Sequence, residues 1–475
     1  MKKILDSVHG YILIPDRYFK HIIDTVYFQR LRRIEQTSTR SIFPSARHDR
    51  FIHSLGVYHI GNMIANQLKN SLSKCNLDKD EIDCLCTSYE VACLLHDCGH
   101  APFSHTFENY YGNKKDLPDD LKSLLDDVQF SKDLTNEIQM GVASHEYVSA
   151  ILTIKKFTNA IHNLGGRLDF IVRMIIGCYY TEPNREIENC FISLLHGDVI
   201  DADRLDYACR DVWASGYCTS TIDLQRLVSS MSIRKNKDYK YVVCFNDNCI
   251  NEIESVLDVR YFQSKYVLTH HTVVYEQWLL VKSVEQMAMH YFPYEHIERL
   301  DDRANMAVEN LCDRRSLWEV VDVGDYKLIY PSDGDFICLM KQHLNDPYIS
   351  EWYSRNYVRY ALWKSPTEFY HYFPQLRGID LKNHPIQLQA HNLLREFLSC
   401  EVSDIVICPT RFKGRAKMNS LNITIRDKIY HYTDLYTENV GEEFEDKSFF
   451  YIYISKKFNN EPKRYQIIDK LKELI

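Results

Sequence analysis

The chain has 475 residues, of which 45% are hydrophobic and 26% are charged, and its formal net charge is −8. This length allows two or three domains, or one large core with an appended lobe, and the negative charge gives no overall attraction to nucleic acid or to anionic membranes. No uncharged apolar run approaches the ~18 residues of a membrane span, and the opening "MKKILDSVHG" lacks a signal-peptide core, so we expect a cytoplasmic protein.

Amphipathic helices are predicted over most of the first 300 residues. In "IIDTVYFQRLRRIEQ", residues 22–36, either Asp24 or Thr25 is expected to cap a helix at its N-terminus. Apolar residues recur at helical spacing in residues 54–70 and again in residues 82–96. These two stretches are therefore predicted to be helices that bury one face.

The pattern changes in the second half of the chain. A small hairpin is predicted over residues 233–245, turning at Asn236–Asp238, and residues 251–292 return to helix. From about residue 400, apolar and polar residues alternate as in strands, in "DIVICPTRF", "LNITIRDKIYHY" and "FFYIYISKKF". We predict a mainly α fold with two parts. Residues 1–300 are expected to form a helical domain that includes the small β-hairpin. Residues 301–475 are expected to form a C-terminal α+β lobe with an oligomerising or regulatory role.

Two features of local composition bear on function. Fifteen cysteines are scattered, odd in number and never spaced C-x-x-C, which favours reduced thiols in the core over a zinc ribbon or a disulfide framework. Residues 29–50 carry six arginines and no lysine. An anionic substrate would need such a local basic cluster, because the whole chain is acidic.

A histidine and an aspartate stand side by side at the end of the predicted helix 82–96. His96 continues its apolar stripe, Asp97 follows, and Gly99 and Pro102 then end the helix. A buried carboxylate is costly unless a cation or hydrogen bonds compensate it, and imidazole with carboxylate suits Fe, Mn, Zn or Co better than Ca. The alternative is that Asp97 caps the helix and His96 is only packed.

Two further segments favour the metal hypothesis. In "RFIHSLG", His53 stands immediately before an apolar helix, beside Arg50. The segment "HGDVIDADRLDYACRD", residues 196–211, carries five aspartates, and apolar runs flank it. Asp203, Tyr207, Arg210 and Asp211 share one helical face, which we expect to point inward.

His53, the pair His96-Asp97 and Asp203 follow the H…HD…D order of the HD-domain metal phosphohydrolases. The segments "IIDTVYFQRLRRIEQ", "FPSARHDRFIHSLGV", "HDCGHAPFSH", "SHEYVS" and "DADRLDYACRD" together resemble the deoxynucleoside triphosphate triphosphohydrolases, which include bacterial dGTPases and eukaryotic proteins that join a sterile-alpha-motif domain to an HD domain. The resemblance spans about residues 6–290 and implies that the helical core is an HD domain.

The resemblance implies hydrolysis of a deoxynucleoside triphosphate to the deoxynucleoside and inorganic triphosphate. It gives His53, His96, Asp97 and Asp203 as ligands of a divalent metal (Fe, Mn, Zn or Mg), with Mg²⁺ accompanying the nucleotide. His105 matches the candidate general acid, Glu108 would orient it, and His145 matches a further active-site histidine.

The resemblance also implies substrate contacts. Positions similar to phosphate-binding residues are Arg50, His100, Arg204 and, more loosely, Lys265. Positions similar to sugar-binding residues are Gln36, Tyr207, Asp211 and Tyr275. The family's stretch after Gln36 is glycine-rich, whereas here it is "TSTRSIFP" with Thr37 and Arg40, so Arg40 could contact phosphate or base, or face solvent.

Asp24, Gln29 and Arg32 match positions that hold an activating guanine nucleotide between subunits in some relatives. A helix cap and surface polar residues account for them equally well. Members of the family are commonly tetramers or hexamers, so the resemblance implies a homo-oligomer.

Two other functions remain open on sequence alone. One is an HD phosphodiesterase or nuclease that acts on another nucleotide, such as a cyclic or alarmone signal. The other is a nucleotide-sensing or nucleic-acid-binding module whose HD site is vestigial. All four metal positions are filled, which argues against a vestigial site.

Overall fold

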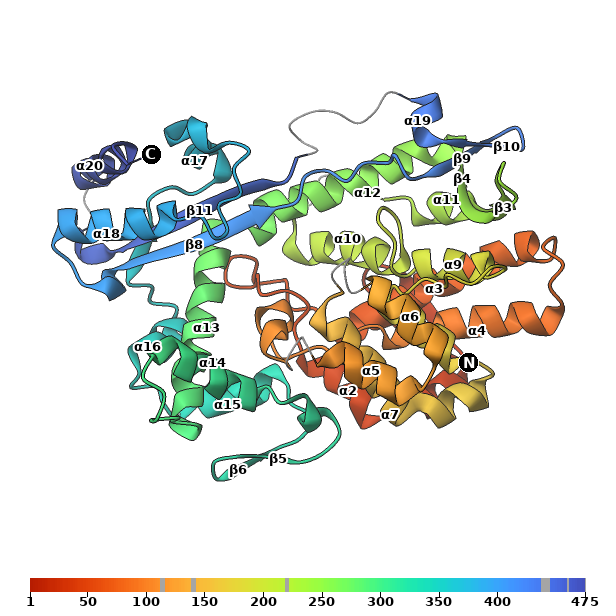
Figure 1. The fold of residues 1–475 in the computed structure, drawn as a ribbon, viewed down its shortest axis with the longest axis horizontal. Helices are drawn as coiled ribbons and strands as arrows, with labels where there is room; N and C mark the ends of the chain where they lie inside the picture. Colours follow the sequence, from red (N-terminus) through yellow and green to blue (C-terminus); the bar gives the residue numbers. More distant parts are fainter. Residues whose placement is uncertain (112–115, 138–141, 218–221, 437–444, 459–460, 475) are drawn as a thin grey trace.

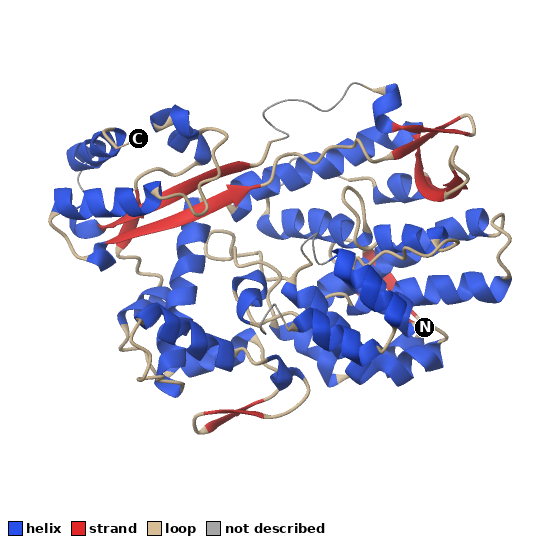
Figure 2. Ribbon diagram, in the orientation of Figure 1, coloured by secondary structure: helices blue, strands red, loops and turns tan. Residues whose placement is uncertain are grey.

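The computed structural model describes residues 1–111, 116–137, 142–217, 222–436, 445–458 and 461–474. Helices dominate it, and the strands form small sheets of two to four strands (Figures 1 and 2). The predicted fold class, mainly α with a small hairpin and a C-terminal region that mixes helices and strands, is confirmed.

Six helices that pack together carry or surround the predicted metal-binding segments. They are α3 (Arg50–Leu72), α4 (Lys79–Leu95), α7 (Ser144–Leu164), α8 (Leu168–Ile176), α9 (Glu186–Ser193) and α10 (Ala202–Ser215). α3 packs against α4 and α10, and α8 packs against α4, α7 and α9. The side chains of Asp49 and Asp201 cap α3 and α10 by accepting from backbone N–H groups. These caps place His53 and Asp203 in the first turns of their helices.

The N-terminal region differs from its prediction. An unpredicted antiparallel hairpin forms from β1 (Lys2–Asp6) and β2 (Gly10–Ile14), followed by α1 (Asp16–Tyr18). The helix predicted to begin after Asp24 or Thr25 is capped by Thr25 but is shorter than expected, because α2 (Val26–Gln29) has one turn and a 3₁₀ turn follows it.

A backbone pairing explains why this helix ends early. From Ile34 the chain is extended, and Arg50 N donates to Ile34 O at 3.0 Å. Gln36 N donates to His48 O at 3.0 Å. Residues 34–36 thus pair with residues 48–50, and the segment between them loops out towards the cavity described below.

The predicted hairpin at 233–245 is confirmed. β3 (Met231–Lys235) pairs with β4 (Tyr241–Asn246), and the turn closes where Asn236 N donates to Lys240 O at 2.9 Å. The helical stretch predicted over 251–292 is present but interrupted, since a break at Thr269–His270 separates α12 (Ile250–Phe262), with its π-helical continuation, from α13 (His271–Tyr291).

The remaining elements complete the helical core and the C-terminal region. The helices are α5 (Leu117–Leu125), α6 (Val128–Glu137), α11 (Leu224–Ser229), α14 (Leu300–Leu311), α15 (Asp333–Lys341), α16 (Pro347–Ser354), α17 (Pro366–Tyr372), α18 (Ile386–Leu398), α19 (Tyr432–Leu435) and α20 (Glu461–Lys472). The strands are β5 (Val321–Val323), β6 (Tyr326–Leu328), β7 (Arg359–Ala361), β8 (Ile405–Phe412), β9 (Asn422–Ile425), β10 (Lys428–His431) and β11 (Lys447–Ser455).

The C-terminal strands belong to two sheets. β11 lies between β7 and β8 in an antiparallel sheet, and Trp363 and neighbouring aromatic residues form an apolar core against it. After β8 the chain runs beside α12 and adds β9 in parallel to β4 (Figure 1). α14 and α15 contribute to the same apolar core as the helices around the predicted metal site. The division near residue 300 remains a prediction. Elements after residue 300 contact elements before it, because α14 and α16 pack against α13, and β9 pairs with β4.

Two properties of the whole chain complete this description. Within the described ranges, none of the helices combines the length and the apolar sequence that crossing a membrane requires. The described cysteines are free thiols, and most of them are buried, as the scattered spacing predicted. Cys218 lies outside the described residues.

Candidate active site

Four predicted metal ligands converge from three helices. His53 comes from the first turn of α3, His96 and Asp97 follow α4, and Asp203 lies in the first turn of α10. Asp203 Oδ1 lies 3.0 Å from His53 Nε2 and 3.6 Å from His96 Nε2. Asp97 Oδ2 lies 3.6 Å from each of the same two nitrogen atoms. The predicted ligands therefore meet at one point.

The geometry of this group fits a transition-metal ion. Ligands bonded at about 2.1 Å stand about 3.0 Å apart at right angles and about 3.4 Å apart at tetrahedral angles. The distances of 3.0–3.6 Å lie close to this range. The Nε2 atoms of His53 and His96 are buried and have no hydrogen-bond partner among the described residues, so a bound cation would satisfy both nitrogens.

The electrostatics of this group also favour a bound cation. Burial alone would lower the pKa of His53, but its close contacts with the carboxylates of Asp203 and Asp206 raise it to about 10. Burial raises the pKa of Asp203, yet its contacts with His53 and His96 hold that pKa far below the usual range. The same carboxylates that hold a proton on His53 would hold a divalent cation.

The second ring nitrogen, Nδ1, of each imidazole is fixed by a hydrogen bond. His53 Nδ1 donates to Asp206 Oδ2 at 2.7 Å, and His96 Nδ1 donates to Cys93 O at 2.9 Å. Both rings therefore turn Nε2 towards the common point, the arrangement usual for metal-bound histidine. A Cβ atom at Gly56 would come within 1.8 Å of Asp206 Oδ1, so a glycine is needed there.

Asp206 is a residue that the sequence reasoning missed. Besides His53, its carboxylate accepts from His9 Nε2 at 2.6 Å and from two nitrogens of Arg210 at 2.8 and 2.9 Å. Arg210 also donates to Asp6 at 2.9 Å, so β1 and the loop after it complete this network. The available signal was the position of Asp206 in "DADRLDY", three residues after Asp203.

A second cluster of titratable groups lies beside the ligands. Glu108 Oε2 accepts from His105 Nδ1 at 2.7 Å and from His145 Nδ1 at 3.0 Å. The His100 ring stacks on His145 with centroids 4.2 Å apart. Arg50 connects the two groups, because Nη1 donates to Asp97 Oδ2 at 2.5 Å and Nη2 lies 3.3 Å from His105 Nε2.

The members of this cluster differ in how readily they hold a proton. Desolvation lowers the pKa of His105, helped by the Arg50 charge and opposed by Glu108, although its side chain is 64% exposed. Burial would also lower the pKa of His145, but the hydrogen bond to Glu108 raises it. Burial holds the pKa of His100 well below its usual value. The cluster thus contains one histidine that protonates readily beside two that do not.

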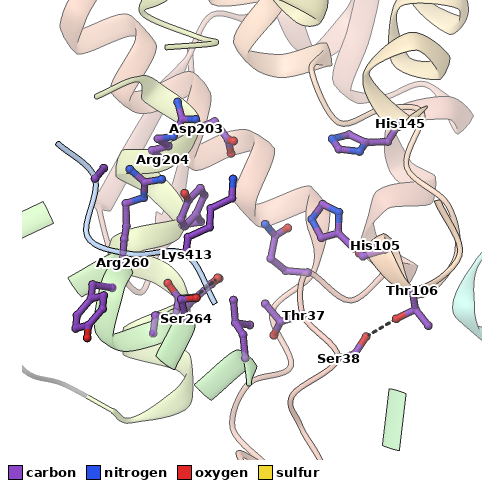
Figure 3. Close-up of a pocket in the computed structure, with 18 of the residues that line it drawn as sticks. Thr37, Ser38, His105, Thr106, His145, Asp203, Arg204, Arg260, Ser264 and Lys413 are labelled. Carbon is purple, nitrogen blue, oxygen red and sulfur yellow. Dashed lines mark hydrogen bonds between the residues drawn. The ribbon is translucent and has the colours of Figure 1, made fainter. Parts of the chain in front are cut away.

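A cavity of about 1240 Å³ joins these groups (Figure 3). Its wall includes His96, Asp97 and Asp203 from the ligand set and His105 and His145 from the second cluster. In Figure 3 Asp203 and the two histidines stand around the same space. The cavity is large enough for a nucleotide, because small-molecule sites typically measure about 300–1,000 Å³.

The fold and the site can now be compared with known proteins. Residues 50–162 match the HD domain family, and this stretch holds His53, His96 and Asp97. The chain contains an HD domain. Asp203 lies beyond the matched stretch, and its carboxylate joins the group that His53 and His96 form.

Curated relatives match a little more than half of this chain. The chain is 30% identical over 268 residues to an uncharacterized protein of Mycoplasma genitalium, covering 55% of each. It is 29% identical over 273 residues to a Dictyostelium discoideum protein named deoxynucleoside triphosphate triphosphohydrolase SAMHD1 homolog, covering 57% of this chain and 46% of that protein. The chain thus spans about half the length of these relatives.

Solved structures share the fold over nearly the whole chain. A phosphohydrolase from Bacteroides thetaiotaomicron aligns with a TM-score of 0.61 and 20% identity over 96% of this chain and 99% of its own. A hypothetical protein from Aquifex aeolicus aligns with a TM-score of 0.57 and 18% identity over 99% of both chains. These likenesses show the fold alone, and they extend it over the C-terminal region as well as the HD domain.

Five of the predicted substrate-binding residues line the cavity of the HD domain: Gln36, Arg50, Arg204, Tyr207 and Asp211. Gln36 is buried, and its Oε1 atom has no hydrogen-bond partner among the described residues. Arg204 pairs with Asp201. The Asp211 carboxylate accepts from His48 Nε2 at 2.7 Å and from Gln263 Nε2 at 2.6 Å, two partners that the sequence did not suggest.

Other predicted residues lie outside the lining of this cavity. Lys265 Nζ donates to Tyr261 Oη at 3.4 Å. Tyr275 Oη donates to Glu351 Oε1 at 2.6 Å and lines a separate, smaller pocket. His100 is fully buried behind the cavity wall. Lys265 and Tyr275 are thus absent from the lining of the cavity beside Asp203, and their contact with substrate stays a prediction.

Arg40, whose role the sequence left open, pairs with Glu35. The three residues matched to an activator site lie together near the surface. Asp24 pairs with Lys2, and Arg32 Nε donates to Gln29 Oε1 at 2.9 Å. Each of the three side chains therefore has a polar partner within the same chain.

The C-terminal region holds two loops of the HD domain in place through Asp333, the first residue of α15. Its buried carboxylate accepts from Glu35 N at 2.9 Å and from Phe103 N at 2.6 Å. Glu35 precedes the cavity residue Gln36, and Phe103 lies two residues before His105. Phe103 has a φ of 56°, an unfavourable conformation for a residue with a side chain, and the hydrogen bond that its N–H donates to Asp333 helps to maintain it.

Asp333→Asn is expected to change how stability depends on pH. Burial raises the pKa of Asp333 to about 6, against the hydrogen bonds from Glu35 and Phe103 and the charges of Arg30 and Arg40. The folded chain therefore keeps a proton on Asp333 that the unfolded chain loses at about pH 4. Its contribution to stability is complete below that pH and is lost as the pH rises through about 6.

The unfolding free energy of the wild type minus that of Asp333→Asn should thus fall by up to about 3 kcal/mol from pH 4 to pH 7. Urea unfolding at several pH values measures this difference. Asp322→Asn, at an exposed position, serves as the control and should show no such trend. A difference for Asp333→Asn that stays constant over this pH range would contradict the assignment.

Proposed function

We propose that this chain is a metal-dependent phosphohydrolase that splits deoxynucleoside triphosphates into the deoxynucleoside and inorganic triphosphate. The observation that carries the proposal is the convergence of His53, His96, Asp97 and Asp203 beside a cavity whose wall includes the last three of them together with His105 and His145. The names of the relatives in Dictyostelium discoideum, Danio rerio and Gallus gallus support the choice of substrate.

The reaction adds water to the α-phosphorus and breaks its bond to the 5′ oxygen of the sugar. A divalent ion held by the four ligands, Fe, Mn, Zn or Mg, would activate water at neutral pH and polarise the α-phosphate. Arg50, which is held against Asp97, is placed to contact the phosphate next to the ligands. This arrangement fixes the reacting phosphate between the ligand set and the histidine cluster.

The departing 5′ oxygen must receive a proton. Glu108 links His105, which faces the cavity, to His145, which protonates more readily, so the pair can supply a proton and recover it from water. Tyr207, Gln36 and Asp211 would contact the sugar, with the unpartnered Gln36 Oε1 free to accept from a hydroxyl. A guanine nucleotide activator and a homo-oligomer, both implied by the sequence resemblance, complete the proposal.

The test is an analysis of products. Purified protein is incubated with each of the four dNTPs and with Mg²⁺ or Mn²⁺, and phosphorus NMR follows the products. The expected products are inorganic triphosphate and deoxynucleoside, and chelation of the metal should stop their formation. Deoxynucleoside monophosphate with pyrophosphate, or turnover of only a cyclic or other nucleotide, would contradict the proposed substrate and favour the phosphodiesterase alternative.

A further inference from the structure

A basic loop from the C-terminal region forms part of the cavity wall. Residues 413–417, "KGRAK", follow β8 and all line the cavity, although they lie about 250 residues beyond the match to the HD domain family. Figure 3 shows the Lys413 side chain directed into the cavity. We call residues 413–417 the basic loop.

Gly414 and Arg415 anchor the basic loop, whereas its two lysines make no such contact with the described residues. Arg415 Nε donates to Asp258 Oδ1 of α12 at 2.5 Å, and Gly414 N donates to Asp446 Oδ1 at 2.8 Å. The residues on either side, Phe412 and Met418, are buried. Lys413 and Lys417 are exposed and have no hydrogen-bond or ion-pair partner among the described residues. The loop therefore presents two uncompensated charges from a fixed backbone.

The cations nearest the metal ligands are already paired. Arg50 contacts Asp97, and Arg204 contacts Asp201. Arg260, also in the cavity wall, donates only to a backbone carbonyl, Val199 O, at 3.3 Å. A triphosphate carries roughly four negative charges, so paired arginines alone would leave much of that charge without a partner. Arg260 and the two free lysines of the basic loop are the cavity cations able to supply it.

We propose that Lys413, supported by Lys417 and Arg260, binds the terminal phosphates of a polyphosphate whose α-phosphate lies at the metal ligands. This inference rests on the proposed function for the identity of the nucleotide, but the ligand chemistry it requires is only a chain of phosphates. It makes the C-terminal region a part of the substrate site and explains how a chain without a net positive charge accepts a polyanion.

The test is the binding of inorganic triphosphate to the full-length protein, measured by titration calorimetry. Lys413→Gln should weaken binding about five- to tenfold, and the loss should shrink as salt is added. Orthophosphate should bind the variant and the wild type alike, because it cannot span from the metal ligands to the basic loop. Lys413→Arg should restore binding, since it restores the charge.

Lys428→Gln is the matched control. Lys428 is an exposed lysine of β10 outside the cavity lining, so the substitution changes the net charge equally. Its affinity for triphosphate should stay within about twofold of wild type. With dNTP as substrate, Lys413→Gln should raise KM while leaving kcat nearly unchanged, because a terminal phosphate is held equally in the ground and transition states.

The outcomes separate this inference from the proposed function. If dNTPs are hydrolysed and Lys413→Gln binds triphosphate as tightly as the wild type, the inference is wrong and the function stands. If no dNTP is hydrolysed but Lys413→Gln weakens triphosphate binding relative to Lys428→Gln, the function is wrong and the polyphosphate site stands.

Discussion

Replacing Asp203 with asparagine is expected to abolish hydrolysis and to remove most of the bound metal. Its side chain, 35% exposed to the cavity, contacts His53 and His96 through one oxygen, so the substitution removes a negative charge without disturbing other partners. Losing one anionic ligand should lower kcat/KM by at least about 10³-fold, because the activation of water depends on the ion. Elemental analysis and a steady-state assay measure the two effects together.

Asp198→Asn is the matched control for this substitution. Asp198 is an exposed carboxylate of the same cavity wall, but it belongs to neither titratable cluster. This variant should keep its metal and most of its activity. An Asp203→Asn protein that retains wild-type metal content and turnover would show that the ion, if any, binds elsewhere.

His105→Gln is expected to lower kcat by about 10²- to 10⁴-fold while changing KM little, the usual effect of removing a general acid. The wild-type rate should fall as the pH rises, since the acid then loses the proton that the 5′ oxygen needs. That decline at high pH should be absent from the variant. The measurement is a pH–rate profile of both proteins with one dNTP.

His196→Gln provides the comparison. His196 lines the same cavity, but its partner, 3.4 Å away, is Glu146 and not Glu108. It should keep both the rate and the pH profile of the wild type. If instead His105→Gln retains full kcat and the His196 variant loses it, the proton donor has been assigned to the wrong side of the cavity.

The convergence of the four predicted ligands could be expected because the motifs that resemble the HD-domain phosphohydrolases are local. His96 and Asp97 are adjacent, and Asp203 lies on a helical face with Tyr207, Arg210 and Asp211, but the resemblance, and not spacing alone, made them candidate ligands. The small hairpin at 233–245 was equally local, with its turn residues between two apolar strands.

The groups that support the ligands were not predictable in this way. Asp206 meets His9 across 197 positions, and Asp333 meets Glu35 across 298. No periodicity in the sequence connects such residues, since only the tertiary fold brings them together. Lys413 is the same case, because a lysine in a loop after a strand looks like solvated surface until the cavity is seen.

The helix predicted to begin after Asp24 or Thr25 is shorter than expected for a related reason. The apolar residues of this segment recur at helical spacing. The Arg30 side chain, however, is buried and donates to Pro331 O at 2.6 Å and to His100 O. Backbone pairing between residues 34–36 and 48–50 then competes successfully with the helix.

The most direct measurement is X-ray diffraction at the absorption edge of the metal, on crystals of protein purified without chelators and without oxygen. The account predicts one ion, seen as an anomalous peak for Fe, Mn or Zn and as ordinary electron density for Mg²⁺, about 2.0–2.3 Å from the nearest atoms of His53, His96, Asp97 and Asp203. The His100, His105, Glu108 and His145 group also has ligand atoms within 4.8 Å of one another. A peak in that group with none among the four predicted ligands, or no ion at either place, would contradict the account.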